Sequence, residues 1–155
     1  MTGTSSILSG VVYVGSRDGK VSAFNETTGA VAWRFNVGSP TTAGGVAGGV
    51  VGPTMTTLIY GTANGTLIAL TEAGQQQWSA NLRQPIIGVA GTYDAVISET
   101  SNGKIFGNRG TQAGLKIWSF QTGAALNSVP AIVDGAVYVG AEDTGMYAVT
   151  PYGRD

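Results

Sequence analysis

The residues best suited to acid–base or metal chemistry are few in this chain. Cysteine and histidine are both absent, which excludes thiolate and imidazole ligands, cysteine nucleophiles and every catalytic dyad built on a histidine base. Glu142 and Asp143 form the only pair of adjacent acidic residues, and their oxygens could contribute to a site for a hard cation such as calcium. The D-x-[DN]-x-[DN]-G spacing of a calcium loop does not accompany them. We therefore interpret the pair as a solvated hairpin turn.

Asp94 and Glu99 are the second candidate pair, because two carboxylates can share acid–base work. They flank a predicted strand and lie five residues apart in the sequence. Along an extended chain this separation points the two side chains to opposite faces of the sheet. A shared site would therefore need a further partner from another part of the fold.

Three tryptophans offer flat rings that could stack a sugar or a quinone. Each follows a glycine by four residues, and the pairs are Gly29 with Trp33, Gly74 with Trp78, and Gly114 with Trp118. A ligand site would break this regularity, whereas the packing of equivalent units reproduces it. We therefore predict that the tryptophans belong to the core.

The composition narrows the function classes further. Apolar residues make up 43% of the 155 residues and charged residues only 11%, so much of the surface must be Thr, Ser, Asn, Gln and Gly. The eight basic residues are spread singly, which argues against nucleic acid binding. No apolar run is long enough for membrane insertion, and the segment 1–10 lacks the pattern of an export signal. We expect either no signal of the chain's own or one already removed.

The elements that position these residues form four copies of one pattern. In each copy two short apolar strands are joined by a turn with a glycine, and these glycines recur at intervals of 46, 38 and 42 residues, at Gly19, Gly65, Gly103 and Gly145. Asp18-Gly19 between two apolar runs predicts a type I′ hairpin turn. The glycine-rich stretch 38–52 opens the second copy and has room for close backbone packing or a bulge. A period near forty with four strands per copy is typical of β-propeller blades.

The predicted fold is all-β, with no helix of consequence. It is a β-propeller array of about four 4-stranded antiparallel blades, the last incomplete, which fits half of an eight-bladed ring. We expect one domain over 1–155, with blades at approximately 3–35, 40–80, 85–120 and 128–155. The near-continuous apolar strands agree with this fold, because neighbouring blades cover both faces of a blade.

The first copy, VYVGSRDGKVSAFNETTGAVAWRF at residues 12–35, resembles the PQQ-type (quinoprotein-like) β-propeller repeat. In that family the tryptophan docks across the joint between two blades, together with an alanine of the third strand and the glycine before the tryptophan. The resemblance implies this docking role for Ala23, Gly29 and Trp33, for Ala69, Gly74 and Trp78, and for Gly114 and Trp118. Gly107 replaces the third alanine, which implies looser or different packing there. The fourth copy has Ala148 and Gly153 and ends before its tryptophan.

The resemblance implies the propeller fold of the family but not the dehydrogenase activity of its enzymes. Quinoprotein dehydrogenases use eight blades, a calcium ion, a catalytic aspartate and usually a vicinal cysteine pair, and this chain has half the blades and no cysteine. Fold alone does not establish function. We therefore expect no cofactor and a non-catalytic scaffold that binds a protein partner in an extracytoplasmic, cell-surface or virion setting. The alternatives are a fragment or half of a PQQ-dependent dehydrogenase and a carbohydrate-binding propeller lectin.

An open arc of four blades leaves one apolar blade face bare at each end. If the blades keep the pitch of an eight-bladed ring, two chains joined head to tail close with two-fold symmetry. We therefore expect a homo-oligomer, most simply a dimer. A compact four-bladed monomer and docking on a larger assembly that supplies the missing strand are the other two arrangements.

Overall fold

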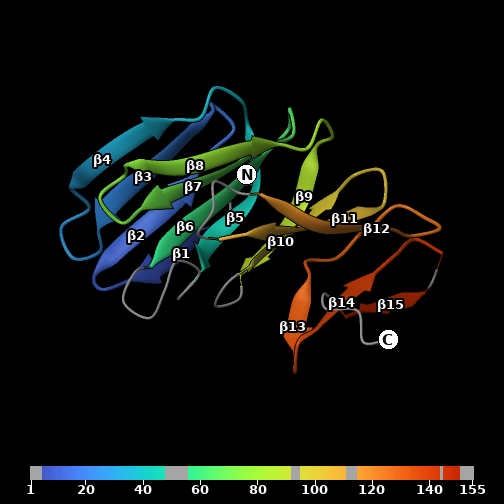
Figure 1. The fold of residues 1–155 in the computed structure, drawn as a ribbon. Coiled ribbons are helices and arrows are strands. Elements are labelled where there is room, and N and C mark those ends of the chain that lie inside the picture. Colours follow the sequence, from blue (N-terminus) through green and yellow to red (C-terminus); the bar gives the residue numbers. More distant parts are fainter. Residues whose placement is uncertain (1–4, 48–55, 92–94, 111–114, 144, 151–155) are drawn as a thin grey trace.

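A computed structural model describes residues 5–47, 56–91, 95–110, 115–143 and 145–150 of the chain. These residues form fifteen strands in four antiparallel sheets (Figure 1). Within the described ranges, no helix with the length and hydropathy needed to cross a membrane occurs. The structure confirms the predicted all-β fold, with three four-stranded sheets and a last sheet of three strands.

Each sheet is a meander, because strands consecutive in sequence are neighbours in the sheet. Blade 1 contains β1 (Ser5–Leu8), β2 (Val11–Gly15), β3 (Lys20–Asn25) and β4 (Val31–Asn36), and blade 2 contains β5 (Thr41–Ala47), β6 (Thr57–Thr62), β7 (Thr66–Thr71) and β8 (Gln76–Asn81). Blade 3 contains β9 (Ile86–Gly91), β10 (Ala95–Thr100), β11 (Lys104–Arg109) and β12 (Lys116–Gln121), and blade 4 contains β13 (Ala131–Val133), β14 (Ala136–Gly140) and β15 (Met146–Val149).

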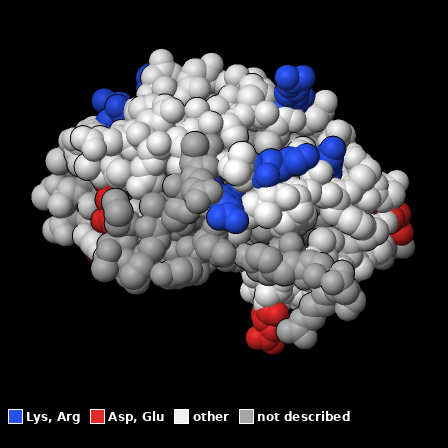
Figure 2. Space-filling model, in the orientation of Figure 1, with Lys and Arg blue, Asp and Glu red and all other residues white. Residues whose placement is uncertain are grey.

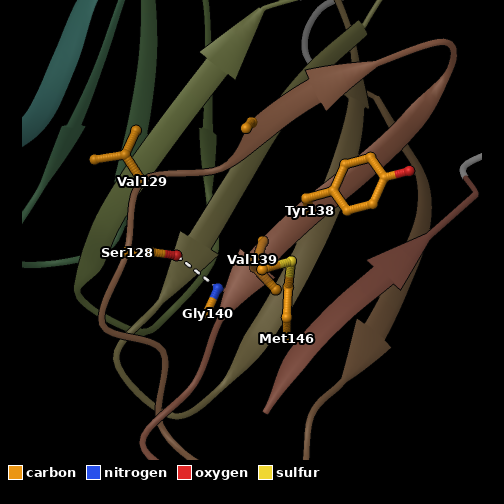
Figure 3. Close-up of a pocket in the computed structure, with 7 residues that line it drawn as sticks. Ser128, Val129, Tyr138, Val139, Gly140 and Met146 are labelled. Atoms are coloured by element: carbon orange, nitrogen blue, oxygen red, sulfur yellow. Dashed lines mark hydrogen bonds between the residues drawn. The ribbon is translucent and has the colours of Figure 1, made fainter. Parts of the chain in front are cut away.

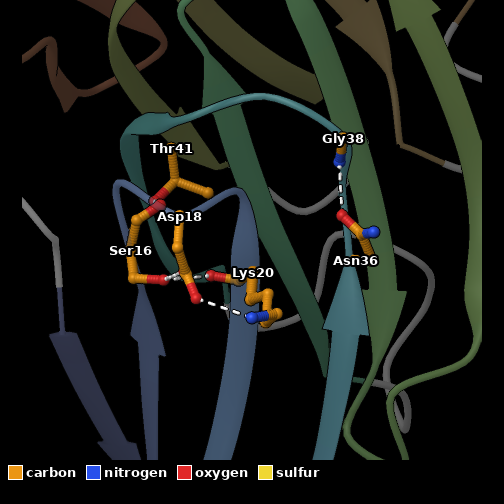
Figure 4. A network of polar contacts seen from close by, with 6 residues as sticks. All are labelled: Ser16, Asp18, Lys20, Asn36, Gly38 and Thr41. Carbon is orange, nitrogen blue, oxygen red and sulfur yellow. Dashed lines mark hydrogen bonds and ion pairs between the residues drawn. The ribbon is translucent and has the colours of Figure 1, made fainter.

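The turn at Asp18-Gly19 differs from the type I′ prediction. Gly19 has a φ of 78°, but Asp18 is not among the residues with positive φ, and the Gly19 N–H donates to the Ser16 carbonyl at 3.2 Å. The turn is therefore an ordinary turn followed by a left-handed glycine. The Asp18 carboxylate accepts hydrogen bonds from the Lys20 ammonium and the Ser16 hydroxyl (Figure 4). These two bonds, that of Lys20 first, hold the pKa of Asp18 at about 2.

Two-residue turns with positive φ at both positions do occur, between the first and second strands of two blades. Ser9 and Gly10 have φ values of 51° and 79°, and Asp134 and Gly135 have values of 48° and 77°. Both turns join directly paired residues, as type I′ hairpins require. The Asp-Gly signal therefore applies to the first hairpin of blade 4.

Gly145 is not the hairpin glycine of the fourth copy. The Ala141 N–H donates to the Gly145 carbonyl at 3.0 Å, just as the Ser16 N–H donates to the Lys20 carbonyl at 2.9 Å. Gly145 therefore takes the place of Lys20, one residue after the repeated glycine. The sequence comparison matched residue types and missed this offset, because the hydrogen bond that defines the position is not visible in the sequence.

The glycine-rich start of blade 2 forms a strand with a bulge. The register of β5 against β6 shifts between Thr41 and Ala43. A side chain at Gly44 would meet the Tyr60 ring at 2.4 Å, so this ring lies directly on the glycine backbone. The predicted bulge and close packing are both confirmed for residues 41–47, and residues 48–52 lie outside the described part of the chain.

The core is divided into three apolar clusters, one at each joint between consecutive blades. The cluster between blades 1 and 2 includes Tyr13, Val21, Ala23, Leu58, Tyr60, Ile68 and Leu70. The cluster between blades 2 and 3 includes Ile59, Leu67, Ala69, Trp78, Ile86 and Val96, and the cluster between blades 3 and 4 includes Ile97, Ile105, Leu126, Val137 and Val139. Strands of blades 2 and 3 are therefore buried on both faces, which explains their near-continuous apolar sequences.

Candidate functional site: the blade joints and the end faces

Each blade has two faces with different side chains. We call leading face the one that packs on the next blade along the chain, and in blade 1 it carries Tyr13, Val21, Ala23 and Trp33. The trailing face is the opposite one, which packs on the preceding blade. In blade 2 it carries Leu58, Tyr60, Ile68 and Leu70, and all four are buried at 4% exposure or less.

Trp33 reaches from blade 1 to the turn between β7 and β8 of blade 2. Its indole Nε1 donates to the Glu72 carbonyl at 2.8 Å. A side chain at Gly74 would meet the Trp33 ring at 2.6 Å, so the indole lies directly on this glycine. Tyr13 supports the indole from the same face, with ring centroids 6.0 Å apart. The contact therefore joins apolar packing to a satisfied indole N–H.

Trp78 makes the equivalent contact between blades 2 and 3. Its Nε1 donates to the Gly110 carbonyl at 2.7 Å, and the side chain is 6% exposed. Trp78 pairs with Ala69 across β7 and β8, as Trp33 pairs with Ala23 across β3 and β4. Both alanines have no exposed surface. From these contacts we propose that the alanine, glycine and tryptophan positions hold successive blades together.

Trp118 lies differently. It pairs with Gly107, and a side chain at Gly107 would meet the indole at 2.3 Å, so the ring occupies the space that a methyl group would fill. Among the described residues, Trp118 Nε1 finds no carbonyl comparable to those that Trp33 and Trp78 reach. The side chain is half-buried, and Gly114 lies outside the described residues.

Gly74 and Gly29 occupy the same repeat position and provide a matched test of the joint. Both have positive φ, 77° and 69°, but a side chain at Gly29 would meet nothing within 4 Å. We expect Gly29→Ala to cost about 1–2 kcal/mol for its left-handed backbone, and Gly74→Ala to cost a further 1–3 kcal/mol or so because its methyl group overlaps Trp33. Urea unfolding followed by circular dichroism measures both. Equal costs would show that Trp33 does not bear on Gly74.

The acidic pair is exposed, as the sequence predicts for a turn. Glu142 and Asp143 both lie at the surface, and Asp143 accepts hydrogen bonds from the Tyr147 hydroxyl at 2.6 Å and the Gly145 N–H at 3.1 Å. The bond from Tyr147, followed by that from Gly145, lowers the pKa of Asp143. No three acidic side chains of the described ranges converge on a metal position. Two exposed carboxylates by themselves do not supply the six or more oxygens that calcium takes.

Glu99 is the residue that sequence reasoning placed wrongly. It lies within β10 instead of flanking it and has no exposed surface, although the sequence treats it as half of a pair with Asp94, which lies outside the described residues. Neither carboxylate oxygen has a hydrogen-bond partner in the described structure. Burial raises the pKa of Glu99 to about 7.

The strand register explains why Glu99 is unusual. Gly15, Gly61 and Gly140 take the same repeat position in the other blades. Each pairs with the equivalent residue of the third strand of its blade, just as Glu99 pairs with Ile105. A side chain at Gly88 would meet the Glu99 carboxylate at 2.7 Å and the Pro130 ring at 2.9 Å. Glu99 is therefore wedged where blades 3 and 4 meet. Aligning VYVG, LIYG and VYVG with VISE could have indicated this position.

Blade 4 exposes its leading face. Tyr138 pairs with Ala148 as Tyr13 pairs with Ala23, but Tyr138 is 37% exposed and Tyr13 only 1%. A hollow of about 370 Å³ opens on this face, and Figure 3 shows Tyr138 and Met146 beside it. Gly140 and Ser128 both line it, and the Gly140 N–H donates to the Ser128 hydroxyl at 2.7 Å.

The surface is otherwise sparsely charged. Figure 2 shows a few separate Lys and Arg side chains and fewer Asp and Glu on one side of the molecule. Lys20 and Asp18 form an ion pair at 2.8 Å. Apolar and uncharged polar contacts therefore decide what this surface can bind.

The family model described as outer membrane protein assembly factor BamB matches residues 17–154. The chain belongs to this family of PQQ-like repeat β-propellers. BamB of Nitrosomonas eutropha is 28% identical over 137 residues, which cover 88% of this chain and 32% of that protein. BamB of Yersinia pestis is 35% identical over 157 residues, which cover 89% and 38%. The chain thus spans about a third of the length of these curated relatives.

Solved structures show the same arc of blades. BamB from Moraxella catarrhalis superposes with a TM-score of 0.81 at 25% identity, over 96% of this chain and 45% of that chain. The computationally designed Ika4 protein superposes with a TM-score of 0.80 at 17% identity, over 94% of this chain and 88% of that one. A similar four-bladed arc therefore makes up nearly all of the Ika4 chain and less than half of the Moraxella catarrhalis BamB chain.

Proposed function

We propose that the chain is a non-catalytic β-propeller scaffold that binds proteins outside the cytoplasm, in the assembly of outer membrane proteins. The observation that carries this proposal is the match to the BamB family over residues 17–154. BamB relatives are named outer membrane protein assembly factors. Among the described residues, no three acidic side chains gather where they could hold a metal ion.

The binding surfaces of this scaffold are its uncharged loops and its two end faces. Exposed large apolar side chains gather on the end faces, with Ile7 and Val31 on blade 1 and Val129, Val133 and Met146 on blade 4. Exposed apolar side chains that share one face favour a protein contact there. The protein partners include a second copy of the chain.

A binding titration tests the scaffold function. A fluorescently labelled outer membrane β-barrel protein, diluted from urea into the folded chain, is expected to show saturable binding by fluorescence anisotropy. The matched control is an unfolded soluble protein of similar length and net charge, for which we expect weaker binding. Equal binding of both would contradict a role in outer membrane protein assembly.

The two alternative functions have direct assays. Dye reduction after addition of the quinone with calcium would identify a dehydrogenase and overturn the non-catalytic proposal. Saturable binding on a glycan array would identify a lectin. We expect neither, because the described tryptophan rings are engaged with neighbouring backbone and glycines instead of facing an open sugar site.

A further inference from the structure

The carboxylate of Glu99 and the ring of Pro130 lie together on the backbone of Gly88, because a side chain at Gly88 would meet them at 2.7 and 2.9 Å. Pro130 is the last residue of the segment 127–130, which leads into the first strand of blade 4 and which we call the strap. We propose that the strap closes over the protonated Glu99 side chain and is displaced when Glu99 ionises. The joint between blades 3 and 4 is thus a switch controlled by pH, a property beyond the proposed scaffold function.

The surroundings of Glu99 stabilise a carboxylic acid and not a carboxylate. The side chain has no exposed surface, and neither carboxylate oxygen has a hydrogen-bond partner in the described structure. Ile105, with which Glu99 pairs, and Ile97 both belong to the apolar cluster of the joint. A negative charge in such a place is costly unless water reaches it. Ionisation therefore favours an arrangement in which the cover over Glu99 has moved.

The charged groups of blade 3 lie away from Glu99. Lys104 and Lys116 both lie over the Phe106 ring, which is on the face opposite to that of Glu99 because side chains alternate along a strand. Arg109 is exposed and pairs with Ala95, at the other end of the strand pair. β9 carries no titratable residue.

On the side of blade 4, the described segment 124–133 carries no titratable residue. Tyr147 packs in the apolar cluster of the joint, and its hydroxyl donates to Asp143 at 2.6 Å. Burial is accordingly the cause that raises the pKa of Glu99 to about 7.

The first strand of blade 4 has one residue more than its counterparts at the place where the strap lies. The second-strand residues 138–141 face the first-strand residues 126–131 in blade 4. The equivalent second-strand residues face 41–45 in blade 2 and 86–90 in blade 3. An additional residue in one strand interrupts the ladder of backbone hydrogen bonds. The strap can therefore move while the pairs on either side of it are kept.

The strap is anchored at its ends and makes two hydrogen bonds with Gly140. Leu126 before the strap and Ala131 after it are both paired with the second strand. The Asn127 N–H donates to the Gly140 carbonyl at 3.2 Å, and the Gly140 N–H donates to the Ser128 hydroxyl at 2.7 Å (Figure 3). The N–H groups of Asn127 and Gly140 therefore report whether the strap is in place.

Hydrogen exchange of single amides, measured by NMR at pH 5 and pH 8, tests the switch. The reference groups are the N–H groups of Thr122 and Glu142, whose bonds of 2.9 Å tie the connection between the blades to blade 3 and to blade 4. The protection of Asn127 and Gly140 relative to these references is expected to fall about tenfold, since a carboxyl with a pKa of about 7 is roughly nine-tenths ionised at pH 8. The chain has no histidine or cysteine, whose side chains ordinarily titrate near this range.

Two variants connect the effect to Glu99. Glu99→Gln keeps the shape without the titrating group, and Glu99→Gly introduces the residue that the other blades have at this position. In both variants the relative protection is expected to be the same at pH 5 and pH 8. Glu26→Gln, in an exposed turn of blade 1, is the matched control and should behave as the wild type. Circular dichroism verifies that each variant is folded.

Two results would overturn the proposal. The first is an unchanged relative protection in the wild type, because separation of whole blades or global unfolding exposes the reference groups together with the strap. The second is a fall of wild-type size in Glu99→Gln or Glu99→Gly, because another group would then control the strap.

Discussion

Replacing Trp78 by alanine is expected to lower the free energy of unfolding by roughly 3–5 kcal/mol, the range for emptying a buried aromatic site. The indole is 6% exposed and lies in the apolar cluster between blades 2 and 3. The substitution also leaves the Gly110 carbonyl without the donor it has at 2.7 Å. Urea unfolding followed by far-ultraviolet circular dichroism measures the change without depending on tryptophan fluorescence.

Trp118→Ala is the matched comparison. Its side chain is more exposed than that of Trp78, and its indole N–H reaches no carbonyl among the described residues, so we expect a smaller loss. The sequence predicts the same order from Gly107, which replaces an alanine. Equal losses for Trp78→Ala and Trp118→Ala would contradict the role of the indole hydrogen bond in the joint. Trp78→Phe separates the contribution of the hydrogen bond from that of the ring.

The stability of the chain is expected to fall as the pH rises from about 5 to 8, because Glu99 must ionise in a buried place. Its pKa is about 7 in the folded chain, above the ordinary value of 4.5, so the folded state binds the proton more tightly than the unfolded state. The stabilising contribution of the protonated form is complete below pH 4.5 and is lost as the pH rises to 7. The shift corresponds to a loss of roughly 3 kcal/mol.

Burial alone raises the pKa of Glu99. β9 and the described segment 124–133 carry no titratable group, Lys104 lies over the Phe106 ring on the opposite face of blade 3, and Tyr138 lies on the far face of blade 4. Tyr147 lies on the blade 4 face that packs on blade 3, and its hydroxyl donates to Asp143. Glu99→Gln keeps the shape and removes the charge. We therefore expect its unfolding free energy to be nearly constant between pH 5 and 8, and a slope equal to that of the wild type would show that another group titrates.

Asp18→Asn is the control for this measurement. The pKa of Asp18 lies at about 2, below its ordinary value, so its contribution to stability is present above pH 4 and is lost only in stronger acid. The two carboxylates therefore act in different pH windows and with opposite signs. Asp18→Asn should leave the slope between pH 5 and 8 unchanged.

A buried carboxylate at a blade joint has a consequence for the scaffold. Glu99 stands where the other blades have glycine, and it adjoins Gly88 and Pro130 at the start of blade 4. Ionisation therefore weakens the joint that holds the blade whose leading face is free.

Much of this fold could be predicted from the sequence because its signals are local. Strand positions follow from short apolar runs, and turn positions follow from glycines such as Gly19 and Gly65, which adopt positive φ. The repetition of glycine and tryptophan at a fixed separation indicated propeller blades and the residues at their joints. Two predictions were wrong: that Gly145 is the hairpin glycine of the fourth copy, and that Asp18-Gly19 forms a type I′ turn. Backbone hydrogen bonds, and not residue types, define those positions.

The tertiary structure alone decided which of these equivalent residues are buried. Ala23 and Ala69 have no exposed surface and Ala148 is exposed, although all three occupy one repeat position. Glu99 is fully buried, although glutamate side chains are usually exposed to solvent. The physical reason is that an apolar blade face is removed from water by the neighbouring blade, so burial depends on whether a neighbour is present and not on the local sequence.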